Sequence, residues 1–317
     1  MLAKLVASFF LMLLITGEAW AQYPNRPIRL IVPAAPGGGT DITARSFVPA
    51  LQDNLGQTVV IENRGGAGGV IGSDVVAKAA PDGYTLLLCY VSHATNPTLA
   101  DKLPYDTLRD FTPITLVSHE PAVLVTHPSV PANSLKEFTA WAKAQAKLSY
   151  ATDPASAGFL AAELYKQQAE VRAEYIPYKG SGPAAADVLA GHVPYMWSVI
   201  SIITPHVKSG RMKGLAIAAE RRAPGLPEVP TTAEGGMPNF AVSGWYGLLA
   251  PAKTPKEIVE RVHAAAAKAL KDEAVLARLA TSGSQPIGAG PAEFDAHIRR
   301  EIPRWEKVLK TAGIQLK

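Results

Sequence analysis

The sequence predicts an α/β protein whose mainly parallel sheets are flanked by helices. Short apolar runs of the β type alternate with helical segments from Gln22 onwards, and glycine-rich turns join several of these runs to the next helix. This alternation is typical of parallel sheets, because a helix carries the chain back between neighbouring strands. With 317 residues, 48% of them hydrophobic and 18% charged, the chain can bury a large core in roughly two domains.

The first 21 residues form a segment of a different kind. A short positive start ends at Lys4, an apolar run covers residues 5–15, and Ala19-Trp20-Ala21 has the small-x-small pattern of a cleavage site. These features are typical of a secretory signal peptide. Gly17-Glu18 interrupts the apolar run too early for a membrane anchor, which needs about 20 apolar residues. We therefore expect a soluble, exported chain that begins at Gln22.

The first part of the mature chain alternates strands with helices. Each strand is an apolar run, and each helix follows a turn that contains glycine. In order, we expect a strand, a helix, a strand, a helix and a strand over residues 28–32, 40–54, 58–61, 69–79 and 85–89.

A second series begins after the run 111–117, with a separate strand over residues 122–126. Two helix starts carry capping boxes, one in Ser134–Glu137 and one in Thr254–Glu257, where a proline follows the threonine. The chain ends in a mostly helical segment. The other expected elements are helices over residues 135–146, 158–168 and 183–190, and strands over 148–151, 174–176, 193–197, 214–218 and 242–249.

Composition excludes several classes of function. The excess of Lys and Arg, 31 against 27 Asp and Glu, suits an anionic small molecule, but it is too small and too dispersed for a nucleic-acid partner. Cys89 is the only cysteine and lies in an apolar run, so we expect a buried hydrophobic side chain and no intramolecular disulfide. The seven histidines form no pair at metal-ligand spacing, and no Gly-x-Ser-x-Gly elbow is present. We expect no metal and no cofactor.

The most informative motif is Pro36-Gly37-Gly38-Gly39-Thr40-Asp41, which follows a strand and opens a helix. Bare backbone N–H groups and the positive end of the helix converge there, so a carboxylate can be held without an arginine. Thr-Asp follows the glycines where a P-loop requires Lys-Ser or Lys-Thr, which disfavours a nucleoside triphosphate. The alternative is a tight turn that uses glycine only for its φ freedom.

Other strand ends supply further candidates. The glycine cluster 65–72 lacks the spacing of a dinucleotide fingerprint, and we interpret it mainly as close packing of a helix on a strand. Loops at the carboxyl ends of parallel strands commonly bind ligands. On that rule we single out His93, the turn 178–183 and the segment 196–198, although ordinary core packing is an equal alternative for its Trp197.

Many short motifs in a fixed order match one family. They include Pro81-Asp82-Gly83-Tyr84-Thr85-Leu86 and Ile176-Pro177-Tyr178-Lys179-Gly180. On these residues the chain resembles the substrate-binding receptors of tripartite tricarboxylate transporters, the Bug family of periplasmic proteins. The resemblance covers nearly all of the mature chain, and its matching stretches are 23–33, 36–41, 55–57, 60–64, 66–69, 81–86, 103–106, 176–180, 226–231 and 249–251.

The resemblance implies a two-lobed periplasmic binding protein of the Venus-flytrap, type II-like fold, with the ligand in the cleft and no catalysis. Residues 22–122 and 245–317 would form the first domain and residues 123–244 the second. Such a receptor would be a monomer in the periplasm. It would deliver an organic carboxylate to the membrane components of its transporter.

Loop chemistry and the resemblance together predict the site. One lobe would contribute Gly37, Gly38, Gly39, Thr40 and Asp41, with Asp41 capping its helix rather than touching the anion. The other lobe would contribute the residues of its strand-to-helix turns, and three larger side chains would shape the wall. These are Thr152, Ser156, Gly180, Ser181 and Ser198 for the turns, and Tyr90, His93 and Trp197 for the wall.

Departures from the family pattern bear on the ligand. Ala34 stands where an aromatic residue is usual, so the pocket is wider or uses an aromatic such as Tyr90 instead. The loop 150–159 is one residue shorter than usual, with Phe159 near the position of a histidine. Together with Trp197, this ring favours a larger or aromatic carboxylate. Two alternatives stay open: a soluble sensor that reports to a membrane kinase, and a secreted enzyme that uses His93 or Ser156.

Overall fold

The computed structural model describes residues 23–154 and 156–313, so the predicted signal peptide lies outside the described residues. The strands are β1 (Ile28–Val32), β2 (Val59–Asn63), β3 (Thr85–Tyr90), β4 (Phe111–Thr126), β5 (Ser149–Thr152), β6 (Glu174–Pro177), β7 (Tyr195–Val199), β8 (Lys213–Ile217), β9 (Ser243–Pro251) and β10 (Gln285–Ala289). The helices are α2 (Gly39–Leu55), the 3-10 turn η1 (Ala67–Gly69), α3 (Val70–Ala77), α4 (Ser92–Leu99), α5 (Leu135–Ala144), α6 (Ala157–Ala169), α7 (Ser181–Leu189), α8 (Ile200–Lys208), α9 (Lys256–Ala269), α10 (Glu273–Ser282) and α11 (Pro291–Ala312).

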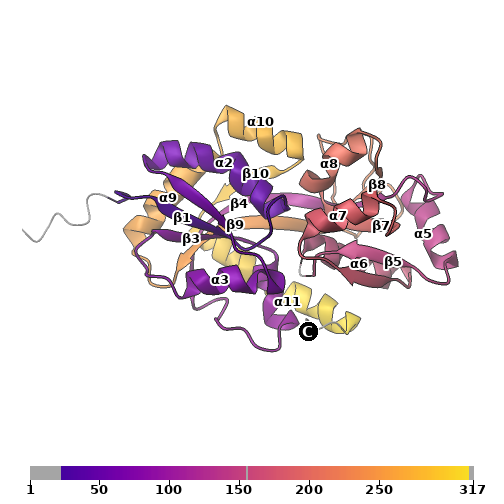
Figure 1. Cartoon of the computed structure of the whole chain (residues 1–317), viewed down its shortest axis with the longest axis horizontal. Coiled ribbons are helices and arrows are strands. Elements are labelled where there is room, and N and C mark those ends of the chain that lie inside the picture. The colour runs from indigo at the N-terminus through magenta and orange to yellow at the C-terminus, as the bar shows by residue number, and fades with distance from the viewer. Residues whose placement is uncertain (1–22, 155, 314–317) are drawn as a thin grey trace, which may run out of the picture.

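The strands form one mixed sheet in the order β2-β1-β3-β9-β4-β7-β5-β6, and β8 and β10 also pair with β4. β1 runs parallel to β2 and β3 at one end, and β5 runs parallel to β6 and β7 at the other. β4 and β9 run antiparallel between these two groups and cross from one lobe to the other (Figure 1). Each lobe therefore contains one parallel group of three strands, whereas every pairing that involves β4 or β9 is antiparallel.

The long strand β4 differs from the two separate runs expected at 111–117 and 122–126. The polar stretch between them indicates a break in the sequence, yet Glu120 is fully buried within the strand. Its carboxylate accepts hydrogen bonds from the hydroxyls of Ser201 and Ser284, both at 2.6 Å. A buried polar group with its hydrogen bonds satisfied fits inside a strand, which the apolar pattern alone does not indicate.

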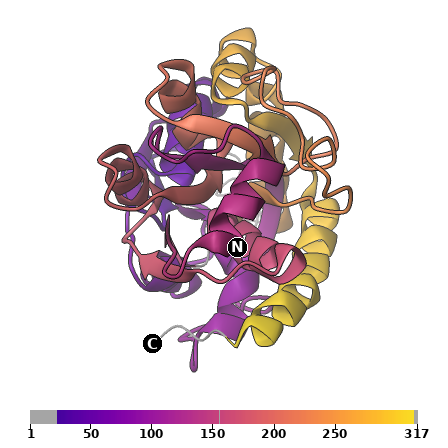
Figure 2. The same cartoon turned by 90° about the vertical axis from the view of Figure 1, so that its right-hand side faces the viewer.

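Helices cover both faces of the sheet and bury one continuous core. α2 packs against α9 on the first lobe, whereas α11 packs against α4, β4 and α6 and so touches both lobes (Figures 1 and 2). Cys89 is buried within β3, as predicted. Among the described helices, none has the length and apolar character needed to span a membrane.

Besides the short turn η1, three elements were not expected: α4, α8 and β10. The first two helices follow their strands almost directly, and each contains an internal proline, Pro97 or Pro205, which in a sequence signals the end of a helix. β10 pairs with β4 through Gln285 and His119, a long-range contact with no local signal.

The two predicted capping boxes had different outcomes. The Ser134 hydroxyl accepts a hydrogen bond from the Glu137 N–H at 3.2 Å, so this box is confirmed. The Thr254 box is wrong, because its hydroxyl donates to the Pro251 carbonyl at 2.8 Å and α9 begins without a side-chain cap. β9 ends at Pro251, and its last carbonyl lies within reach of the threonine.

Candidate ligand-binding cleft

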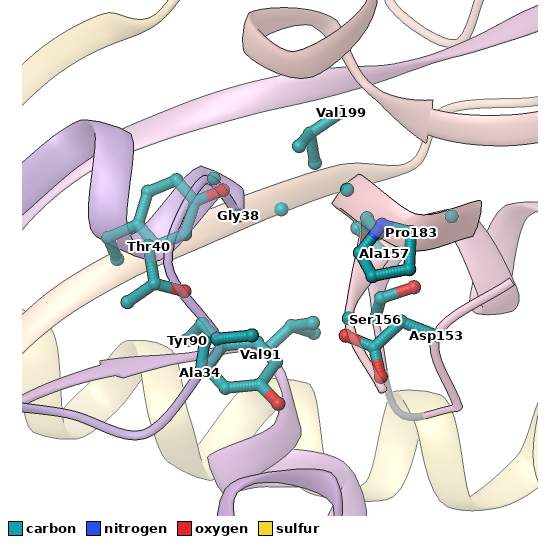
Figure 3. Close-up of a pocket in the computed structure, with 18 of the residues that line it drawn as sticks. Ala34, Gly38, Thr40, Tyr90, Val91, Asp153, Ser156, Ala157, Pro183 and Val199 are labelled. Carbon is teal, nitrogen blue, oxygen red and sulfur yellow. The ribbon is translucent and has the colours of Figure 1, made fainter. Parts of the chain in front are cut away.

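A cleft lies between the two lobes and is open to solvent (Figure 3). Its lining comes from three turns that each lead from a strand into a helix, together with the ends of β3, β7 and β9. The three turns precede α2, α6 and α7. The cleft therefore lies where the carboxyl ends of parallel strands from both lobes face each other, which is the usual ligand position in α/β proteins.

The turn before α2 uses its glycines for two different purposes. Gly37 has a φ of +78°, which favours glycine at a tight turn, and a side chain there would meet open space. Gly39 begins the helix, and a Cβ at this position would collide with the Tyr246 hydroxyl and lie 3.0 Å from Val199 Cγ2. The turn interpretation therefore applies to Gly37, whereas Gly39 allows the close approach of β9 and β7 to the helix start.

Asp41 is held inside this turn. Its carboxylate accepts a hydrogen bond from the Gly37 N–H at 2.9 Å and from Asn63 at 3.1 Å, and it pairs with Arg45 at 3.0 Å. Burial opposes its ionisation, but the hydrogen bonds from Arg45, Gly37 and Asn63 outweigh that effect and keep the pKa of Asp41 below its ordinary value. The carboxylate closes the loop that precedes α2 and does not line the cleft. The prediction that Asp41 caps the helix is wrong, because the N-cap is Gly38 and no side chain caps α2.

The starts of α6 and α7 face the same space. Ser156 is the N-cap of α6, and its hydroxyl accepts a hydrogen bond from the Phe159 N–H at 3.1 Å. Gly180, with a φ of +115°, precedes α7, whose first residue is Ser181. The first N–H groups of a helix have no acceptor within the helix, and each helix start carries about half a positive charge. Three such starts converge on the cleft, and this arrangement of backbone groups is suited to an anion.

Aromatic side chains form the walls. Tyr90 comes from β3, and Trp245 and Tyr246 come from β9. Burial raises the pKa of both tyrosines, and the neighbouring carboxyls of Asp153 and Glu120 add to the effect for Tyr90 and Tyr246 respectively. Both hydroxyls are therefore neutral at ordinary pH. The Tyr246 hydroxyl interacts with the Glu120 carboxylate, whereas the Tyr90 hydroxyl can donate a hydrogen bond to a ligand.

The structure brings seven of the thirteen predicted site residues to the cleft. These are Gly38, Gly39, Thr40, Tyr90, Ser156, Gly180 and Ser181. The other six lie outside its lining: Gly37, Asp41, His93, Thr152, Trp197 and Ser198. Whether any of them contacts a ligand stays a prediction.

The residues outside the lining are buried or engaged elsewhere. His93 lies in α4 rather than in a loop, between the rings of Tyr105 and Phe111, and burial lowers its pKa to about 4. Trp197 packs against Phe240 with ring centroids 5.1 Å apart, in agreement with the alternative of ordinary core packing. Ser198 and Thr152 are buried in their strands.

Sequence reasoning missed several residues of the lining, among them Asp153, Val199, Trp245 and Tyr246. Asp153 directly follows the predicted Thr152, in the loop whose length departs from the family pattern, so a signal was present. The other three lie in or at the end of strands, and only the folded sheet brings them to the α2 turn. The predicted preference for a larger or aromatic carboxylate depends on the rings of Phe159 and Trp197. Neither ring lines the cleft.

Catalytic chemistry finds no support among the lining residues. The Ser156 hydroxyl is used as a helix cap, and His93 is buried in the first lobe. Among the lining residues that the structure describes there is no histidine. Nowhere in the described part of the chain do three His, Cys, Asp or Glu side chains gather as metal ligands.

Comparisons with known proteins agree with this geometry. Residues 43–314 match the family described as "Tripartite tricarboxylate transporter family receptor". Protein BugT of Bordetella pertussis (strain Tohama I) is 40% identical over 299 residues, which cover 93% of this chain and 92% of that protein.

Two solved structures are similar along nearly their whole length. The periplasmic binding protein BugD is 35% identical with a TM-score of 0.88, and the match covers 93% of this chain and 100% of that one. R. palustris Rpa4515 with adipate is 35% identical with a TM-score of 0.89, and the match covers 93% and 99% of the two chains. These similarities confirm the predicted resemblance and the two-lobed α/β fold. The chain belongs to the family of tripartite tricarboxylate transporter receptors, whose members are periplasmic solute-binding proteins.

Proposed function

We propose that this protein is a periplasmic receptor that binds an organic carboxylate between its lobes and delivers it to the membrane components of a tripartite tricarboxylate transporter. The observation that carries the proposal is the convergence of three helix starts on one cleft whose described lining residues include no lysine or arginine. Backbone N–H groups then hold the carboxylate. The related Rpa4515, solved with adipate, supports this ligand class.

Closure of the cleft requires two domains that move relative to each other. We assign residues 22–122 and 245–317 to one domain and residues 123–244 to the other. Strand pairing supports this division, because β4 pairs with β9 as far as Pro121 and Ser243 and pairs with β7 from Ala122 and Val199 onwards. The pair β4–β9 would act as the hinge, and the ligand would stabilise the closed arrangement.

Export and assembly complete the proposal. Residues 1–21 would be removed as a signal peptide, and the mature chain would act as a monomer in the periplasm. A sensor for a membrane kinase would bind the same ligand in the same cleft. The two roles are separated by ligand uptake in cells, which requires this chain only if it serves a transporter.

The test is a thermal-shift panel on the mature chain, residues 22–317, refolded after denaturation to remove bound ligand. Aliphatic and aromatic mono-, di- and tricarboxylates are compared. A ligand at 100 times its dissociation constant adds about 2.7 kcal/mol, which raises Tm by several degrees. A panel in which no carboxylate raises Tm would contradict the proposal.

Thr40→Val provides the matched perturbation of the site. Thr40 lines the cleft at the start of α2, and valine keeps its shape while removing the hydroxyl. We expect weaker carboxylate binding by about tenfold with an unchanged fold, because one hydrogen bond to a charged group is lost. Thr281→Val, on the exposed face of α10, is the control and should leave affinity unchanged. Unaltered affinity in Thr40→Val would remove this hydroxyl from the site.

A further inference from the structure

Asp153 is the one charged side chain among the described residues that line the cleft. It directly follows β5 and precedes the cap of α6, and it is half-buried. Figure 3 shows its carboxylate on the side of the cleft opposite Tyr90. Within residues 23–154 and 156–313, no group donates a hydrogen bond to this carboxylate, and burial alone accounts for its shifted pKa.

The groups around Asp153 do not neutralise it. Tyr90 faces it from β3 and is neutral, and Glu120 lies behind Tyr246 with its oxygens bonded to two serine hydroxyls. Lys179 is exposed and does not line the cleft. Burial raises the pKa of Asp153 to about 7, whereas the nearby positive helix starts favour its ionised form. An unpaired carboxylate in such a position is costly unless a ligand supplies its partner.

The charges of the cleft set the ligand charge that it can hold. Three helix starts supply roughly +1.5 elementary charges together. Ionised Asp153 cancels one of these charges, which leaves too little to balance a ligand with two carboxylates. A ligand with one carboxylate and one positive group meets complementary charges at both of its ends.

We infer that the ligand carries a protonated nitrogen that pairs with Asp153, so that the receptor takes an amino carboxylate in preference to a dicarboxylate. This inference rests on the proposed function and names the substrate class of the same cleft. The ligand carboxylate would contact the N–H groups at the starts of α2 and α7, and its nitrogen would donate hydrogen bonds to Asp153. Asp153 would then determine specificity by attracting amino carboxylates and repelling dicarboxylates.

The experiment uses straight-chain ligands of four, five and six carbons in matched sets. Each set contains the simple carboxylate, its 2-amino and terminal-amino derivatives, and the dicarboxylate. Affinities are measured by titration calorimetry at pH 8 on the refolded mature chain. We expect one amino derivative to bind at least tenfold more tightly than the simple carboxylate and the dicarboxylate of its set.

Asp153→Asn tests the residue itself. The amide keeps the shape of the side chain but removes its charge, so the preferred amino carboxylate should lose at least tenfold in affinity and the dicarboxylates should gain. Between pH 6 and 8 the wild-type affinity for the amino carboxylate should rise as Asp153 ionises, and the D153N variant should show no such rise. Asp101→Asn, at an exposed position outside the cleft, is the matched control and should change neither result.

The outcomes separate this inference from the proposed function. If no carboxylate of the wider panel binds, the proposed function fails. If carboxylates bind but every amino derivative is matched or exceeded by the dicarboxylate of its set, the specificity inference is wrong and the receptor role stands. A dicarboxylate that binds equally well to the wild type and to D153N at pH 8 would also overturn the inference, because ionised Asp153 would then not repel a second carboxylate.

Discussion

Glu120→Gln should remove a pH dependence of stability that originates at the junction of the lobes. Glu120 lies in β4, fully buried, and accepts hydrogen bonds from Ser201 in α8 and from Ser284 just before β10. Burial raises its pKa from 4.5 to about 7, although both serine hydroxyls favour the ionised form. The folded protein therefore holds a proton on Glu120 more tightly than the unfolded chain does.

The magnitude follows from linkage. A rise in pKa from 4.5 to about 7 corresponds to about 3 kcal/mol of free energy of unfolding. Because the folded-state pKa is the higher one, this contribution is fully present below pH 4.5 and is lost as the pH rises to 7. Glutamine keeps the shape of the side chain but does not titrate, so the E120Q variant should lose about 3 kcal/mol less than the wild type over this range.

Urea unfolding of the mature chain at several pH values between 4.5 and 8 measures the effect. The pKa of Asp153 is also raised, so its titration changes the free energy of unfolding in the same direction over this pH range. The comparison of Glu120 with Glu120→Gln is therefore repeated in the D153N background. Glu228→Gln, an exposed control, should retain the wild-type slope. Equal slopes for E120Q and the wild type would refute the reasoning, since Glu120 would then have the same pKa in both states.

The remaining predictions concern the cleft and the core of the first lobe. Gly39→Ala should destabilise the fold by about 1–3 kcal/mol in urea, because the added methyl group collides with the Tyr246 hydroxyl, whereas Gly38→Ala, whose Cβ meets only the Ala35 carbonyl at 3.4 Å, should be tolerated. Equal losses of unfolding free energy in Gly39→Ala and Gly38→Ala would contradict the close approach of the Tyr246 hydroxyl to Gly39. His93→Phe should abolish a loss of stability of up to about 3 kcal/mol as the pH falls from 6.5 to 4, because the buried imidazole, with its pKa lowered to about 4, stabilises the fold only while neutral. If His93→Phe lost as much free energy of unfolding in urea as the wild type between pH 6.5 and 4, the lowered pKa of His93 would not explain the loss.

Local chemistry predicted most of the fold, and long-range contacts account for the rest. The strand β1 was predicted with its observed bounds, and the helix that follows the three glycines was predicted to within one residue at each end, because apolar runs and glycine turns are local signals. β10 was missed, since its pairing with β4 has no signature in its own five residues. Six of the thirteen predicted site residues reach the cleft for the same local reason, because they lie at the starts of α2, α6 and α7. Tyr246 could not be found this way, because only the sheet order brings β9 next to the start of α2.

Two aspartates near helix starts show why one of them is informative about a ligand. Asp41, in the first turn of α2, has the Gly37 N–H, Asn63 and Arg45 as partners, and its pKa lies below the ordinary value. Asp153, just before α6, has none of these among the described residues, and its pKa is raised to about 7. The protein thus satisfies one carboxylate internally and leaves the other at the surface of the cleft. Because a half-buried carboxylate without a hydrogen-bond donor among the described residues costs stability, its position beside three helix starts favours a ligand that brings both a negative and a positive group.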